Sequence, residues 1–293
     1  MIPQPWRSRL LDLLTYSVLS LGCLMALTPI IWGLLCSLKK QANVVLYPPQ
    51  WFPSPLTFEH YWILISERGI PRFFLNSLIL SLGTILVVLV VAAPGAYAAA
   101  RYKFRGKNSI LMTILATSMI PGISILIPIY LLGIRAKLLN NYPFMILVYA
   151  AWLIPQAIWF IKNFIEVVPR DMEEAALIDG CTVVGAFCRV VLPMIQPGLA
   201  AIAILNFIFV WNDFLIGAVL TSQEEMRTVQ VGLVRFIQDT MGVWWGQFLA
   251  FAMLAILPVL LLFFMLQKRF VEGLTAGGVK GWPADGLSRH AAW

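Results

Sequence analysis

Long apolar stretches alternate with short charged ones along the 293 residues of this chain. Five of the apolar stretches contain no Asp, Glu, Lys or Arg, and a sixth contains only Asp213. A helix needs about 20 residues to cross the hydrocarbon core of a bilayer, and its backbone groups must bond within the segment. The pattern therefore predicts six transmembrane helices, at residues 13–37, 73–100, 108–134, 142–161, 190–223 and 240–267.

The composition indicates a polytopic membrane protein. Hydrophobic residues make up 60% of the chain and charged residues 12%, whereas soluble domains carry about 25% charged residues. The first stretch is too long for a secretory signal, whose apolar region spans about 7–15 residues, so we expect it to remain as an anchor. We predict an all-α fold that forms a single domain over residues 1–293, with its membrane core at 13–269.

The distribution of Lys and Arg predicts the orientation of the helices. With both termini in the cytoplasm, 13 basic residues lie inside and 8 outside. The short loop from Arg101 to Lys107 carries four of them, and short loops follow the positive-inside rule best. We expect cytoplasmic termini, an outside loop at 37–72, a cytoplasmic loop at 164–193 and a cytoplasmic tail at 268–293.

The other charged and sulfur-containing groups predict no further ligand. Basic residues beside membrane helices are typical of topology signals next to anionic lipid, so the net charge of +7 requires no nucleic-acid partner. The four cysteines and two histidines lack the spacing of a zinc site. We expect reduced thiols and no metal.

The loop at 164–193 is predicted to form two short helices. Pro169 suits the first helical position, and Asp171, Glu173 and Glu174 follow where the helix dipole favours negative charge. Gly180 ends that helix, because glycine adopts a positive φ at low cost. Thr182 can cap a second helix, which we expect to stop near Leu192 because Pro193 disfavours helix in the residue before it.

The charge of this loop indicates contact with another protein. A surface segment that lies on lipid is basic and amphipathic, whereas four acids lie here between Asp171 and Asp179, against Arg170 alone. Ala175 and Ala176 are good helix formers and too small to hold a partner at a distance. The loop therefore predicts a protein-binding surface between the fourth and fifth crossings.

Polar side chains inside the predicted helices are candidates for a solute pathway, because unpaired polar groups in lipid are costly. Asn206 and Asp213 lie seven residues apart and so share a helix face. Carboxylate, amide and indole groups together suit polyol recognition. Such groups also join helices to one another, and both roles stay open. The candidates are Asn76, Tyr149, Trp152, Gln156, Asn206, Trp211, Asn212 and Asp213.

The loop at 164–193 resembles the EAA loop of ABC-importer permease subunits. Glu174-Ala175-Ala176, Gly180 and Leu192-Pro193 match that motif at its full spacing, with Val190 where isoleucine is usual. Three further stretches are similar to the maltose-permease-like, carbohydrate-uptake branch of the family, at residues 47–61, 73–77 and 273–281. The resemblance runs from the first helix to about residue 281.

This resemblance implies the fold of a type I ABC importer permease and a division of labour among subunits. The chain would work in the bacterial inner membrane with a second, similar permease subunit (a heterodimer), two cytoplasmic ATPase subunits and an external solute-binding protein. It has no Gly-x-x-x-x-Gly-Lys-Ser/Thr motif, so we expect no catalysis and no cofactor in this chain, with ATP and magnesium bound by the ATPase. The implied function is ATP-driven import of a sugar or sugar-like solute by alternating access.

The resemblance also implies roles within the loop. The helix around Glu174–Gly180 would sit in a cleft of the ATPase and move as a lever. We expect Glu174 to make a polar contact with the ATPase and Gly180 to fix the angle of the lever. The remaining residues of this coupling site are Ala175, Ala176, Asp179, Leu192 and Pro193.

Other functions stay open at this point. A permease for phosphate, amino acids or peptides would share the EAA loop. A stand-alone secondary transporter would need intramembrane acids or broken helices in related halves, and the sequence has one such acid and no evident repeat. A membrane enzyme would need clustered carboxylates, histidines or a metal site, and only two histidines exist.

Overall fold

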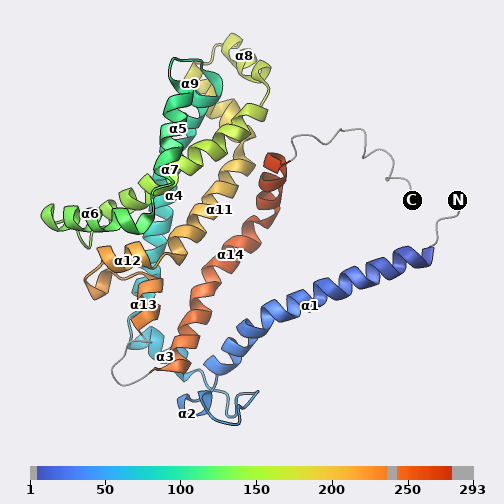
Figure 1. Ribbon diagram of the computed structural model, residues 1–293, viewed down its shortest axis with the longest axis vertical. Coiled ribbons are helices and arrows are strands. Elements are labelled where there is room, and N and C mark those ends of the chain that lie inside the picture. The colour runs from blue at the N-terminus through green and yellow to red at the C-terminus, as the bar shows by residue number, and fades with distance from the viewer. Residues whose placement is uncertain (1–4, 236–242, 279–293) are drawn as a thin grey trace. The chain divides into compact units, whose positions relative to one another are not determined.

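The computed structural model describes residues 5–235 and 243–278 (Figure 1). Every element in these ranges is helical, and no strand occurs in them. Residues 240–242 of the sixth predicted stretch and residues 279–293 of the predicted tail lie outside the described residues.

Four of the predicted crossings are single long helices. They are α1 (Pro5–Ser37), α4 (Ile70–Arg101), α7 (Tyr142–Val167) and α14 (Trp245–Gly278). Each is long and apolar enough to span a bilayer. Backbone groups in such a helix bond within the segment, so apolar side chains can face lipid without leaving polar groups unsatisfied.

The third predicted crossing is a bent pair of helices. Residues 108–134 form α5 (Lys107–Thr117) and α6 (Gly122–Arg135), which meet at 84°. The break contains Pro121, whose ring removes an N–H donor and excludes helix in the residue before it. Gly122 begins α6 directly against the ring of Trp152 on α7, where a larger side chain would not fit.

The fifth predicted crossing is also broken. The helical run Val183–Met194 meets α11 (Gln196–Asn212) at 74°. Beyond α11 the backbone of Asp213 is extended, and α12 (Leu215–Leu220) follows as a separate short helix. Counting each bent pair as one span gives up to six crossings among the described residues, which is the number predicted.

The chain forms two compact units, which are described separately. The first contains Met1–Arg72 and Val231–Leu257, and the second contains Phe73–Gln230 and Pro258–Trp293. The first unit includes α2 (Gln41–Val44), α3 (Glu59–Ser66) and most of α13 (Val229–Arg235). The single domain predicted for the whole chain stays a prediction.

In the first unit, the proline-rich segment at 37–72 folds around a buried lysine. The Lys39 ammonium lies 4.4 Å from the ring centre of Trp32 and donates a hydrogen bond to the Gln50 carbonyl. Trp51 packs edge-on against Trp32, with ring centres 5.3 Å apart. Helix α3 begins at Glu59, and the Thr57 hydroxyl accepts a hydrogen bond from the N–H of Glu59 at 3.1 Å.

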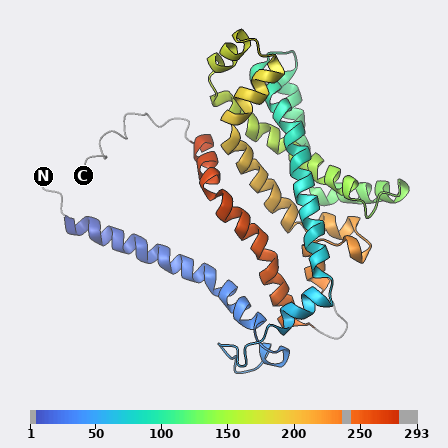
Figure 2. The same cartoon turned by 180° about the vertical axis from the view of Figure 1, so that it is seen from behind.

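In the second unit, α7 forms the centre of the apolar core. Its buried residues include Met145, Leu153, Ile161 and Ile165, which recur at helical spacing and pack among side chains of α4 and α11. Gly198 lets α11 approach the ring of Phe164 on α7 closely. Viewed from either side, α8 (Arg170–Ile178) and α9 (Val183–Ala186) lie at one end of α4 and α7 (Figures 1 and 2).

Candidate functional site

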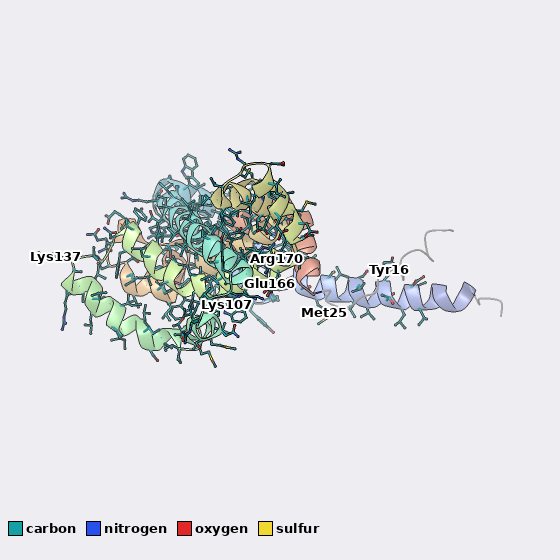
Figure 3. The ribbon with its side chains drawn as sticks, turned by 90° about the horizontal axis from the view of Figure 1, so that it is seen from above. Tyr16, Met25, Lys107, Lys137, Glu166 and Arg170 are labelled. Atoms are coloured by element: carbon teal, nitrogen blue, oxygen red, sulfur yellow. The ribbon has the colours of Figure 1, made fainter. Side chains whose placement is uncertain are left out.

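The first helix of the EAA segment, residues 164–193, begins one residue later than predicted. Pro169 is the residue before α8 and has an extended backbone (ψ 135°), so the helix starts at Arg170. The missing N–H of Pro169 is not needed there, because the first N–H groups of a helix have no partner within it. Figure 3 labels Arg170 and Glu166, which lie on either side of the short connection from α7 to α8.

The end of α8 is fixed by Gly180 at φ +88°. The N–H of Cys181 donates to the Ala176 carbonyl at 3.0 Å, and the N–H of Gly180 donates to the Leu177 carbonyl at 3.1 Å. This pair of bonds defines a Schellman motif, in which glycine supplies the left-handed residue. The chain therefore leaves α8 in a direction set by local backbone hydrogen bonds.

The second helix of the segment begins as predicted and ends later. The Thr182 side chain accepts a hydrogen bond from the Gly185 N–H at 3.1 Å and caps α9. A π-helical turn follows at Phe187–Val191, and α10 (Leu192–Met194) continues past the expected stop at Leu192. In this wide turn the Leu192 N–H donates to the Phe187 carbonyl, five residues back. The backbone hydrogen bonds are therefore already shifted by one residue when the chain reaches Pro193.

Most of the predicted coupling residues lie on the surface of the EAA segment. Glu174, Ala175, Asp179, Gly180 and Pro193 are exposed, whereas Ala176 and Leu192 are half-buried. Five large apolar side chains are exposed beside them, at Met172, Leu177, Ile178, Val183 and Val184. Ile178 is 86% exposed. We call these five residues the apolar patch of the EAA segment.

One acid of α8, Glu173, is buried, although its residue type and position in the helix do not distinguish it from the neighbouring acids. The Glu173 carboxylate accepts a hydrogen bond from Arg101 Nε at 2.6 Å, and Arg101 Nη2 lies 2.5 Å from the same oxygen. The Tyr97 hydroxyl donates to the other carboxylate oxygen at 2.9 Å. Arg101 also donates to the Val168 carbonyl at 2.8 Å. The end of α4 is thereby tied to α8.

The residues of α4 before Arg101 carry a signal for close helix packing, but not for the contact with α8. Ala92, Ala96, Ala99 and Ala100 precede Arg101, and small residues on a membrane helix allow another helix to come close. All four alanines are buried in the structure. The charge count nevertheless assigned Arg101 to topology alone, because pairing between distant residues is not visible in a single sequence.

Asp213 acts as a cap in this structure. Its Oδ2 atom accepts hydrogen bonds from the Tyr149 hydroxyl at 2.8 Å, the Ile216 N–H at 2.9 Å and the Gly217 N–H at 3.2 Å. The carboxylate thus satisfies backbone donors at the start of α12 that have no partner in the helix. Tyr149 is fully buried on α7, so the contact joins α7 to the break after α11. A pathway role for Asp213 stays a prediction.

Asn76 joins three parts of the second unit. Its amide nitrogen donates to the carbonyls of Glu225 and Arg227, both at 2.8 Å, and its amide oxygen accepts from the Tyr142 hydroxyl at 2.7 Å. The neighbouring Ser77 hydroxyl accepts from the Val229 N–H at 2.9 Å. Asn76 is fully buried, and these contacts hold the segment after α12 against α4.

The other pathway candidates divide by exposure. Trp211 is 1% exposed and packs against the rings of Phe207 and Phe74, with ring centres 5.4 and 5.8 Å away. Asn206 is buried, and its amide nitrogen has no hydrogen-bond partner among the residues that the structure describes. Of the three further candidates, Gln156 and Asn212 are exposed and Trp152 is half-buried. The structure brings together Tyr149 with Asp213, but not the whole predicted set.

A cavity of about 480 Å³ lies between α6 and α12. Its lining is almost entirely apolar and includes none of the predicted pathway residues, being formed by Ile123, Leu126, Ile127, Tyr130, Leu215, Ala218 and Val219. The cavity therefore offers few hydrogen-bond partners for a polar solute. α6 itself ends at Arg135, shortly before Lys137, which Figure 3 labels.

Replacing Tyr149 with phenylalanine is expected to lower stability modestly. The change removes one hydrogen bond to Asp213 but leaves its two backbone donors, so the expected loss is about 1 kcal/mol. The melting temperature of the purified subunit in detergent would measure it. Tyr130→Phe, on α6, is the matched control and should melt like the wild type. Equal melting temperatures for both variants would contradict a stabilising hydrogen bond between Tyr149 and Asp213.

The geometry of the EAA segment agrees with a comparison of the whole sequence. Residues 92–275 match the model of the family described as binding-protein-dependent transport system inner membrane component. The chain belongs to this family. Its members are permease subunits of ABC transporters, which carry out transport rather than catalysis. The matched range contains the EAA segment and both bent helix pairs.

Relatives of this permease are similar over most of their length. The diacetylchitobiose uptake system permease protein DasC of Streptomyces coelicolor is 34% identical over 253 residues, covering 86% of this chain and 91% of its own. The sulfoquinovosyl glycerol transport system permease protein SmoH of Agrobacterium fabrum is 35% identical, covering 87% and 89%. The trehalose transport system permease protein SugB of Mycobacterium tuberculosis is 35% identical, covering 87% and 93%.

Solved structures show the same fold. A chain of a bacterial ABC transporter involved in the import of the acidic polysaccharide alginate matches with a TM-score of 0.78 at 24% identity, covering 92% of this chain and 99% of that one. A chain of a bacterial alginate transporter in complex with a pentasaccharide-bound periplasmic protein matches with a TM-score of 0.65 at 15% identity. The predicted type I importer permease fold is confirmed by these matches.

Proposed function

We propose that this chain is the membrane-spanning permease subunit of an ATP-driven importer that carries a sugar or sugar-like solute into the cytoplasm. The observation that carries the proposal is the EAA segment, in which exposed acids and the apolar patch lie on two short helices fixed by Gly180 and Thr182. Family membership supports the transport role. The named solutes of three relatives, diacetylchitobiose, sulfoquinovosyl glycerol and trehalose, support a carbohydrate.

The proposal includes the partners and the orientation. A separate ATPase binds ATP and magnesium, because the chain has no phosphate-binding loop. A second permease subunit, two ATPase subunits and an external solute-binding protein complete the importer. The termini and the EAA segment face the cytoplasm, as the count of 13 against 8 basic residues favours.

ATP binding can drive alternating access only if the ATPase contacts the two states of the permease differently. To reverse a 1:99 ratio of the two permease states, the ATPase must bind one state more tightly by about 5.5 kcal/mol. Burial of apolar surface contributes about 25 cal/mol per Å², so a patch of five large apolar side chains can supply energy of that order. Exposed Glu174 and Asp179 would add charge-assisted contacts at the rim.

The test is affinity purification of the tagged chain from native membranes in mild detergent, followed by mass spectrometry and by uptake assays. Recovery of an ATPase with a phosphate-binding loop and of a second permease subunit is the expected result. A panel of radiolabelled mono- and oligosaccharides, with phosphate, an amino acid and a peptide as the non-sugar arm, then identifies the solute. Recovery of this chain alone in several detergents would overturn the proposal.

A substitution in the apolar patch tests the docking surface. Ile178→Glu is expected to reduce the amount of ATPase recovered with the subunit about tenfold, because the carboxylate would be buried at the contact without a partner. Val45→Glu is the matched control, since Val45 is an aliphatic side chain that is 66% exposed far from the EAA segment in sequence. Equal recovery of the ATPase with both variants would show that docking does not use the patch.

A further inference from the structure

Two neighbouring glutamates of α8 have opposite environments. Glu174 is exposed, whereas Glu173 is 7% exposed and bonded to Arg101 and Tyr97. Among the described residues, Glu173 is the one α8 side chain with a hydrogen bond or ion pair to another helix. Glu173 therefore faces the permease itself, while Glu174 remains available to a partner.

The contacts of Glu173 converge on a single turn of α4. Tyr97 and Arg101 are four residues apart and so lie on the same helix face. Arg101 also holds the Val168 carbonyl at the end of α7, and the Tyr97 ring packs against Phe187 in the π-helical turn, with ring centres 4.8 Å apart. The turn of α4 from Tyr97 to Arg101 thus contacts the end of α7, α8 itself and the π-helical turn that comes after α8.

These contacts are suited to holding α8 rigidly. The side chains of Arg101 and Glu173 are each 9% exposed, so little water competes for their hydrogen bonds. A guanidinium presents its donors in a fixed planar arrangement, which fixes direction as well as distance. Without the pair, α8 would be held by the residues at its ends, Pro169 and Gly180, and by its packing against α9 and the π-helical turn.

We propose that Arg101, Glu173 and Tyr97 form a joint that makes α8 move together with α4 and so sets how tightly ATP hydrolysis is coupled to transport. The inference rests on the proposed function, because it requires an ATPase that moves α8. The chain alone connects α8 only to α7 and α9, whereas the joint adds a direct connection to α4. At its other end, α4 is fixed by Asn76 to the segment at Glu225–Arg227 and to Tyr142.

The three residues are positioning residues, and they have distinct parts in the joint. Glu173 supplies the acceptor on α8, and Arg101 supplies the charge that balances it and the bond to α7. Tyr97 orients the second carboxylate oxygen. A movement of α8 away from α4 must break all of these bonds together, so α4 is carried along instead.

The first test compares solute transported per ATP hydrolysed in the assembled importer, reconstituted in liposomes. Glu173→Gln is expected to bind the ATPase and hydrolyse ATP like the wild type but to transport about tenfold less solute per ATP. Glu166→Gln is the matched control, because Glu166 is an ion-paired glutamate at the end of α7, bonded to Lys162 at 2.6 Å. The solute transported per ATP should not change in this variant. Equal ratios in the two variants would overturn the joint.

A second variant guards against loss of folding. Tyr97→Phe removes one hydrogen bond and leaves the ion pair intact, so the subunit should accumulate normally and show a smaller fall in the same ratio. If Glu173→Gln does not accumulate, an unchanged ratio in Tyr97→Phe overturns the proposal.

A third measurement needs no partner and separates the joint from the proposed function. Cys181 lies three residues after the end of α8, is hydrogen-bonded to its Ala176 carbonyl and is half-buried, so its labelling by a maleimide reports movement of α8. In a chain whose other three cysteines are serine, Glu173→Gln is expected to raise the labelling rate at least threefold over Glu166→Gln. Unchanged labelling overturns the joint. Failure of the wild-type chain to recover any ATPase overturns the proposed function, whatever the labelling shows.

Discussion

Replacement of Gly180 by proline is expected to abolish solute uptake while leaving the subunit in the membrane. Proline fixes φ near −65° and has no N–H, whereas Gly180 has a φ of +88° and donates to the Leu177 carbonyl. The Schellman motif would be lost, and α9 would leave α8 in another direction. Gly180 is exposed and has no atom within 4 Å of where a Cβ would lie, so the apolar core should be unaffected.

A graded series makes this prediction specific. An L-residue in the left-handed conformation costs about 1–2 kcal/mol, so Gly180→Ala should retain part of the uptake. Asparagine tolerates that conformation better, so Gly180→Asn should retain more. Gly69→Ala is the matched control, because Gly69 also has a positive φ (+63°) and open space around it but lies outside the EAA segment.

The measurement is uptake of labelled solute by membrane vesicles, normalised to the amount of subunit on an immunoblot. Normal uptake by Gly180→Pro would show that the direction of the chain after α8 does not matter for coupling. Loss of the subunit from the membrane would show instead that Gly180 is needed for folding.

Asn76→Asp is expected to remove most of the folded subunit. The change keeps the shape of the side chain but replaces the amide that donates to the Glu225 and Arg227 carbonyls. A carboxylate there would face two carbonyl oxygens at a site that is fully buried. An uncompensated buried charge costs about 3–5 kcal/mol, which is a large part of the stability of a typical domain.

The melting temperature and the yield of monodisperse subunit in detergent would measure this loss. Asn163→Asp is the matched control, because Asn163 is exposed on α7 and the same change there should have little effect. A normal yield of Asn76→Asp combined with lost uptake would favour the pathway role over the structural one. A normal yield with normal uptake would contradict both.

Periodicity and turn chemistry predicted the local structure of the EAA segment well. The conformations of Gly180 and Thr182 depend on neighbouring residues only, and both positions behave as their residue types favour. The predicted end of the second helix, near Leu192, was wrong because a π-helical turn accommodates Pro193. Such a turn depends on packing around Phe187. The breaks at Pro121 and Ile195 divided two predicted crossings, and a proline lies at or next to each break, Pro121 and Pro197.

The class of this protein follows from the residue pattern alone. An apolar composition and six stretches long enough to span a bilayer require helices, because lipid offers no hydrogen bonds to the backbone. The EAA spacing predicts the surface for a partner. These features depend on residues close together in the chain, which is why one sequence is enough to show them.

Which polar residues are already paired becomes visible once the helices are packed in three dimensions. Glu173 and Glu174 are adjacent and chemically identical, yet one is bonded to Arg101 and the other is exposed. Asn76 is bonded to backbone carbonyls about 150 residues away, at separations of 149 and 151 residues. A side chain's role depends on its neighbours in space, and those neighbours are set by the packing of whole helices.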